Sequence, residues 1–134
     1  MKILSAPTHG ILDYALVVLF ALLPSVFGLT GLPAIVLYVF AGAHLLVSLL
    51  TRYPLGALKR LPFNAHGLLE LTVAVVLVAL PWLLDFADEA TARSVFIGMG
   101  VLVFVLWLLS DYTPSRISTE ADNKTSIPPP ATPT

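Results

Sequence analysis

The chain has 134 residues, of which 57% are hydrophobic and only 11% are charged, and its formal net charge is -1. Soluble domains typically contain about 25% charged residues, so this composition excludes an ordinary water-soluble domain and indicates a membrane protein. The lack of cysteine excludes disulfides, thiolate metal sites and thiol redox chemistry.

Four apolar segments follow one another along the chain. They cover approximately residues 10–29, 32–50, 66–86 and 94–110. Each is close to the roughly 20 residues that a helix needs to cross the hydrocarbon core of a bilayer. The sequence therefore predicts an all-α membrane protein with four transmembrane helices.

The connections between these segments differ in composition. Residues 28–33 contain two glycines and a proline, which predicts a tight turn. Residues 51–65 alternate apolar and basic side chains, as expected of a segment in the lipid headgroup region, where Lys59 and Arg60 would contact anionic lipid. Residues 113–134 are rich in Pro, Ser and Thr and predict a disordered cytoplasmic tail.

The basic residues lie mainly on one side of the predicted membrane. Four crossings place the N-terminus, the connection 51–65 and the tail on the same side, and six of the seven basic residues lie there. The exception is Arg93, in a mainly acidic connection. The positive-inside rule therefore predicts a multi-pass protein of the inner (plasma) membrane with both termini cytoplasmic.

The first and third segments share a pattern at a spacing of 57 residues. It consists of a His-Gly pair, an acidic residue and a late proline: His9, Gly10, Asp13 and Pro24, then His66, Gly67, Glu70 and Pro81. With a two-residue insertion, residues 51–53 then align with residues 110–112. We therefore predict two tandem helical hairpins in parallel orientation, at about 8–53 and 65–112, within one transmembrane domain of residues 1–112.

The late proline of each copy has a physical meaning. A proline inside a helix removes one backbone hydrogen bond, so Pro24 and Pro81 predict helix kinks. A hairpin with a late proline, followed in the second copy by Trp82, resembles the SPW-repeat family of small bacterial membrane proteins. The family's tripeptide corresponds to Leu23-Pro24-Ser25 and Leu80-Pro81-Trp82. The resemblance implies the fold and a bacterial membrane, but no activity.

Ionisable side chains within the predicted helices form the candidate site. His9 and Asp13 are four residues apart, as are His66 and Glu70, so each pair shares one helix face. His44, in the second segment, lies at a similar depth. Ionisable groups inside a membrane are costly and tend to face the protein interior. We therefore expect these five side chains to form one polar cluster near the cytoplasmic side.

Several roles are open to this cluster. Thr8 and Asn64 stand where helix N-caps are expected, which favours interfacial capping and hydrogen bonding between the repeats. One alternative is a haem held by two of the three histidines, and another is a divalent metal held by imidazole and carboxylate. A third is proton or small-solute passage that uses Asp13 and Glu70.

For the whole protein, we expect a structural or accessory role rather than an enzymatic one. The sequence contains no catalytic motif and no nucleic-acid surface, so it names no catalytic residue. We expect no cofactor, with haem or a divalent metal as alternatives. The expected partners are the lipid bilayer and either a second copy of the chain or another membrane protein.

Overall fold

A computed structural model describes residues 3–112, and over this range the fold is all-helical. It contains four helices: α1 (Ala6–Val26), α2 (Gly31–Leu50), α3 (Phe63–Leu83) and α4 (Ala90–Leu109). Each is long and apolar enough to cross a membrane, which confirms the predicted fold class of four transmembrane helices. The predicted disordered tail lies outside the described residues.

Three of the helices, α1, α3 and α4, begin about one turn earlier than the apolar pattern predicts. α1 follows Ser5 and has a proline at its start, and α3 follows Pro62. Proline is favoured in the first turn because its missing N–H has no partner there in any case. Thr8 and Asn64 consequently lie inside the helices, so their prediction as N-caps is wrong. The histidine and acidic pairs lie correspondingly deeper in the helices.

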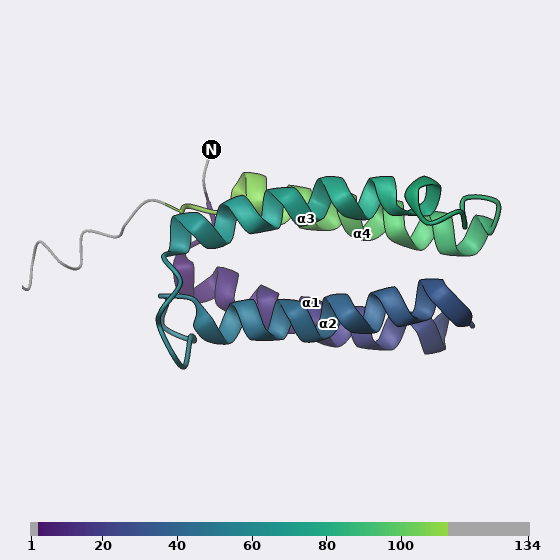
Figure 1. The fold of residues 1–134 in the computed structure, drawn as a ribbon. Helices are drawn as coiled ribbons and strands as arrows, with labels where there is room; N and C mark the ends of the chain where they lie inside the picture. The colour runs from purple at the N-terminus through teal and green to yellow at the C-terminus, as the bar shows by residue number, and fades with distance from the viewer. Residues whose placement is uncertain (1–2, 113–134) are drawn as a thin grey trace, which may run out of the picture.

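The helices are arranged as two antiparallel pairs (Figure 1). α1 packs closely on α2, and α3 packs closely on α4. The two pairs meet through side chains of one continuous apolar core, which includes the fully buried Phe20, Leu37, Leu77 and Phe96. Close backbone contact is thus concentrated within each pair. The seam between the pairs is wide enough to hold large side chains.

Pro24 and Pro81 lie in the last turns of α1 and α3, and both are buried. Their carbonyl groups accept hydrogen bonds from the backbone N–H groups of Leu29 and Phe86, at 2.8 and 2.9 Å. These bonds close the ends of the helices, as C-terminal capping bonds do. The prolines therefore mark helix ends, and the kinks that they predict stay predictions.

Two short backbone bridges tie the other end of the bundle together. Leu4 pairs with Ser110, and Thr51 pairs with Leu61. The bridges hold the residues that follow α4 and α2 beside the segments that precede α1 and α3. Both ends of the described chain and the connection between α2 and α3 therefore lie at this end. Lys59 and Arg60 are exposed there, and their contact with lipid headgroups stays a prediction.

Candidate functional site

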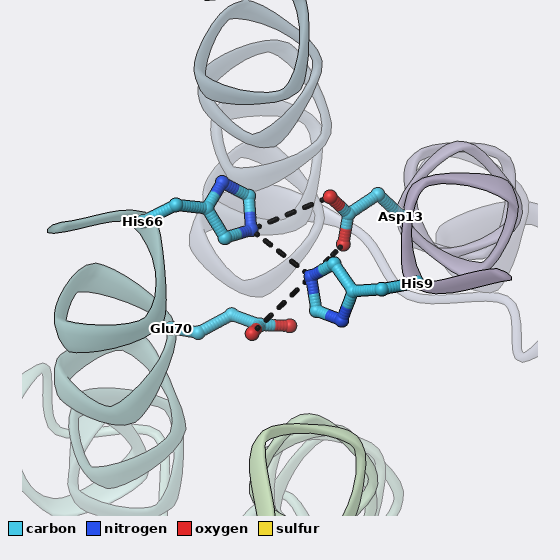
Figure 2. Close-up of side chains that lie close together, drawn as sticks. All are labelled: His9, Asp13, His66 and Glu70. Atoms are coloured by element: carbon cyan, nitrogen blue, oxygen red, sulfur yellow. Dashed lines mark hydrogen bonds and ion pairs between the residues drawn. The ribbon is translucent and has the colours of Figure 1, made fainter. Parts of the chain in front are cut away.

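All five side chains of the predicted polar cluster lie together at this end of the bundle: His9, Asp13, His44, His66 and Glu70. Figure 2 shows two of them extending from α1 and two from α3, toward one another across the seam. Asp13 is fully buried and Glu70 is 3% exposed. Neither acid lies in the first turn of its helix. Helix capping by these acids is therefore wrong, whereas the contacts of His9 with His66 and Ser110 do connect the two predicted repeats.

The polar atoms of four of these residues converge on one point. The Nε2 atom of His9 lies 3.3 Å from Nε2 of His66 and 3.2 Å from Oδ1 of Asp13. It lies 3.6 Å from Oε2 of Glu70. Nε2 of His66 lies 3.3 Å from Oδ2 of Asp13. One possible ligand atom from each of the four residues fits within a group whose members lie within 4.8 Å of one another.

Hydroxyl groups hold the opposite edge of each imidazole ring. Nδ1 of His9 lies 2.7 Å from Oγ of Ser110, and Nδ1 of His66 lies 2.8 Å from Oγ1 of Thr51. Each hydroxyl also donates to a carbonyl group of its own helix, to Leu106 at 2.6 Å and to Val47 at 2.7 Å. A hydroxyl has a single proton, so it must accept at the imidazole. Both rings therefore carry their proton on Nδ1.

This assignment has a direct consequence for the Nε2 atoms. In a neutral imidazole that is protonated on Nδ1, Nε2 is an acceptor with a lone pair. The lone pairs of His9 and His66 then face each other and the carboxylate oxygens of Asp13 and Glu70. Facing acceptors repel one another strongly in a protein interior of low dielectric constant. The arrangement is stable only with a cation, a proton or a metal ion, between them.

Two tyrosines orient the carboxylates. The Tyr53 hydroxyl donates to Oδ2 of Asp13 at 3.3 Å, and the Tyr112 hydroxyl donates to Oε2 of Glu70. Burial and the neighbouring Asp13 carboxylate raise the pKa of Tyr53, and burial and the Glu70 carboxylate raise the pKa of Tyr112. Both phenols therefore stay protonated and act as donors. Ser48 approaches the same oxygen of Asp13 at 3.5 Å.

Three buried polar atoms of the cluster have no hydrogen-bond partner in the described part of the chain: Oδ1 of Asp13, Nε2 of His44 and Oε1 of Glu70. Nε2 of His44 lies 3.5 Å from Oδ1 of Asp13. Most buried polar atoms in native proteins have a partner, so each exception needs an explanation. Unpaired acceptors and imidazole nitrogens in one cluster are typical of a site that binds a ligand.

Aromatic rings cover the cluster at the end of the bundle. The Phe63 ring lies 4.8 Å from that of Tyr112, 5.3 Å from that of His9 and 6.0 Å from that of Tyr53, between ring centroids. The two tyrosine rings lie against glycine. A Cβ atom at Gly10 would overlap the Tyr53 ring, and one at Gly67 would lie 2.7 Å from the Tyr112 ring. The glycine after each histidine thus leaves room for the ring that closes the site.

Sequence reasoning identifies the five titratable residues but not the groups that orient them, which are Ser48, Thr51, Tyr53, Ser110 and Tyr112. The signal for four of them is present in the predicted repeat, because residues 51–53 align with residues 110–112. Both aligned segments place a hydroxyl on a histidine and a phenol on an acid.

Comparisons of the chain with protein-family models, with curated proteins and with solved structures find no match. The resemblance to the SPW-repeat family therefore stays a prediction, and the function has to be argued from the site itself.

Proposed function

We propose that this membrane protein binds one divalent transition-metal ion in the polar cluster. The ligands are Nε2 of His9, Nε2 of His66 and the carboxylates of Asp13 and Glu70. The observation that carries this proposal is the orientation of the two imidazole rings. Ser110 and Thr51 take up both Nδ1–H groups, so both Nε2 lone pairs face the carboxylates. Histidines that bind metals usually donate their other N–H to a neighbouring acceptor in this way.

The spacing of the ligand atoms supports the proposal. Zn²⁺ binds imidazole nitrogen and carboxylate oxygen at about 2.0–2.2 Å, so the ligands of a tetrahedral site lie about 3.3–3.5 Å apart. The Nε2 atoms of His9 and His66 lie 3.3 Å apart, His9 lies 3.2 Å from Oδ1 of Asp13, and His66 lies 3.3 Å from Oδ2 of Asp13. Glu70 lies slightly farther away, at 3.6 Å from His9. One atom from each of the four residues fits within a group of 4.8 Å, so an ion of ordinary size would draw the most distant ligand atoms closer together.

The charge of the cluster also supports a divalent ion. Asp13 and Glu70 are buried in the part of the protein that lies within the membrane, where an uncompensated charge is costly. Two neutral imidazoles, two carboxylates and one divalent cation sum to zero. A proton shared between the imidazoles would compensate only one of the two negative charges.

The donor set narrows the class of metal. Imidazole suits zinc, iron, copper and nickel. This chain has no cysteine, so it lacks the thiolate ligands that favour softer ions. Carboxylates suit the harder divalent ions of the series. We therefore expect Zn²⁺, Fe²⁺ or Mn²⁺, and Zn²⁺ is the probe of choice because it has no redox chemistry.

The haem alternative fits the geometry less well. Two histidines that ligate haem stand on opposite faces of a flat macrocycle. Here the Nε2 atoms of His9 and His66 lie 3.3 Å apart, with the carboxylates beside them. A macrocycle between the two nitrogens would have to displace carboxylate oxygens that lie 3.2–3.6 Å from them. His44 does not change this, because its Nε2 atom lies near the same Asp13 carboxylate.

Proton or solute passage is also less well supported. All the buried polar side chains in the described part of the chain lie in or beside the cluster, at one end of the bundle: His9, Asp13, His44, Ser48, Thr51, His66, Glu70 and Ser110. The rest of the buried core consists of apolar side chains, among them Phe20, Leu77 and Phe96. A path across the membrane needs polar groups at successive depths. A site at one depth is better suited to holding an ion.

The proposed metal would connect the two helix pairs. One histidine and one acid come from α1, and the other two ligands come from α3 (Figure 2). The ligands thus come in equal numbers from the two predicted hairpins. A structural or accessory role for the protein stays a prediction, and a metal shared by the two pairs is consistent with it.

The two hydroxyl groups provide the test. The full chain, purified in detergent with its affinity tag removed, is expected to bind one Zn²⁺ per chain in an equilibrium titration. Ser110→Ala and Thr51→Val should each weaken Zn²⁺ binding by about 10–100-fold, the usual effect of losing such a supporting hydrogen bond.

Ser94→Ala and Thr72→Val are matched controls. Their hydroxyls are exposed and donate to a carbonyl group four residues earlier, as those of Ser110 and Thr51 do. Both controls should bind Zn²⁺ like the wild type. If the wild-type chain binds no Zn²⁺, Fe²⁺ or Mn²⁺, or if the controls weaken binding equally, the proposal fails.

A further inference from the structure

A cavity of about 110 Å³ lies beside the proposed metal site, between α2 and α3. Three of its lining residues belong to the polar cluster. His66 and Glu70 are proposed metal ligands, and His44 is not. The other walls are apolar: Phe40, Ala43, Val47, Leu69 and Val73. We propose that the metal has an exchangeable coordination position that faces this cavity, and that it takes a small uncharged oxygen or nitrogen donor from the bilayer. This inference rests on the proposed metal site.

The distances indicate which position exchanges. The Nε2 atoms of His9 and His66 lie 3.3 Å apart, and each lies within 3.3 Å of one oxygen of Asp13, which is Oδ1 for His9 and Oδ2 for His66. Glu70 stands farther off, and its Oε2 atom is already the acceptor for Tyr112. Three firm protein ligands and one open position are the pattern of reactive rather than purely structural zinc sites. The position of Glu70 is therefore the one at which a water or another donor can replace the protein ligand.

The second observation is a departure from the internal repeat. The residue that aligns with His44 in the second half is Val103, which packs in the apolar core. The four metal ligands have counterparts in both halves, whereas His44 has none. Its Nε2 atom and Oε1 of Glu70 both lack hydrogen-bond partners and both belong to residues that line the cavity. These two atoms are placed to hydrogen-bond a molecule bound at the metal.

The shape of the cavity determines what can enter. At the end of the bundle, the rings of Phe63, Tyr53 and Tyr112 cover the cluster. On the opposite side lie Phe20 and Phe40, whose rings stack at a centroid distance of 5.9 Å.

The remaining side faces the bilayer. Ala43 and Leu69 line the cavity and are exposed on the protein surface, so the opening lies between α2 and α3. A volume of about 110 Å³ holds only a few water-sized molecules. The bilayer excludes ions. The ligand is therefore small, neutral and able to cross the membrane interior.

Cobalt provides the readout. The full chain is loaded with Co²⁺ in detergent, and its visible d–d absorption is followed during titration with imidazole, a small neutral nitrogen donor. We expect a saturable band shift with one imidazole per metal. Ala43→Leu should fill the opening and weaken the binding of imidazole at least tenfold without changing the Co²⁺ content. Leu69→Phe should act in the same way and serves as a second variant if the first fails to fold.

Ala79→Leu is the matched control, because Ala79 lines a groove between α3 and α4 that contains none of the cluster residues. It should bind imidazole like the wild type. After each titration the protein is desalted and its Co²⁺ content is measured, which excludes stripping of the metal. If Co²⁺ binds but imidazole causes no shift, or if both opening variants bind imidazole like the wild type, this inference is wrong and the metal site stands. If Co²⁺ does not bind at all, the proposed function fails as well.

Discussion

Removing either imidazole of the pair is expected to abolish tight metal binding. His9→Ala and His66→Ala each delete one of the two Nε2 atoms that lie 3.3 Å apart beside the Asp13 carboxylate. Removal of a supporting hydrogen bond weakens metal binding by about 10–100-fold, and the loss of Zn²⁺ affinity in these variants should be larger. Both variants should therefore purify without stoichiometric metal, as measured by elemental analysis of the full chain.

The same variants should lose the effect of metal on stability. An ion present at about 1,000 times its dissociation constant stabilises the folded state by about 4 kcal/mol. A chelator should therefore lower the apparent unfolding temperature of the wild-type protein in detergent and leave that of His9→Ala and His66→Ala unchanged. His44→Ala is the matched control, because this buried histidine approaches Asp13 but lies outside the four-ligand group. It should keep the metal, and equal loss of metal in all three variants would contradict the assigned ligand set.

The two acids are expected to be unequal. Asp13 lies within 3.5 Å of three imidazoles, and its Oδ2 atom also accepts from Ser48 and Tyr53. Neutralising one partner of a buried charge pair typically costs about 3–5 kcal/mol, which is a hundredfold or more in binding. Asp13→Asn should therefore weaken Zn²⁺ binding by about a hundredfold or more.

Glu70 has fewer contacts, namely His9 at 3.6 Å and the Tyr112 hydroxyl. Glu70→Gln keeps the size of the side chain and one oxygen, so it should weaken Zn²⁺ binding by only about tenfold, at the lower end of the range for peripheral contacts. The two dissociation constants, measured by competition with a chelator of known affinity, decide the matter. Equal effects of Asp13→Asn and Glu70→Gln would contradict the assignment of Asp13 as the firm ligand and Glu70 as the exchangeable one.

Much of this architecture can be predicted from sequence periodicity. Four apolar segments of membrane-spanning length predict the four helices, and the spacing of four residues predicts that His9 and Asp13 share a face, as do His66 and Glu70. The depth of His44 can also be predicted, because the second helix runs in the opposite direction and brings this residue level with the other four. The cost of ionisable groups in lipid then places all five in the interior.

The sequence predicts the helix starts and the hydroxyl contacts less well. Thr8 and Asn64 resemble N-caps because capping preference is a local property, but the prolines before or within the first turns start the helices earlier. The partner of His66 is Thr51, which follows α2, and that contact depends on how the two helix pairs pack together. Helix propensity contains no information on such packing, so the orientation of both imidazole rings could not be predicted.

X-ray absorption at the zinc edge tests the central claim most directly, because it reports the ligands of the bound ion. On the full chain with one Zn²⁺ bound, the proposed site predicts a nitrogen and oxygen shell at about 2.0–2.2 Å. It also predicts outer-shell scattering from two imidazole rings, and from only one in His9→Ala or His66→Ala loaded with excess Zn²⁺. A shell of oxygen atoms without imidazole scattering in the wild-type protein would contradict a metal site built by His9 and His66.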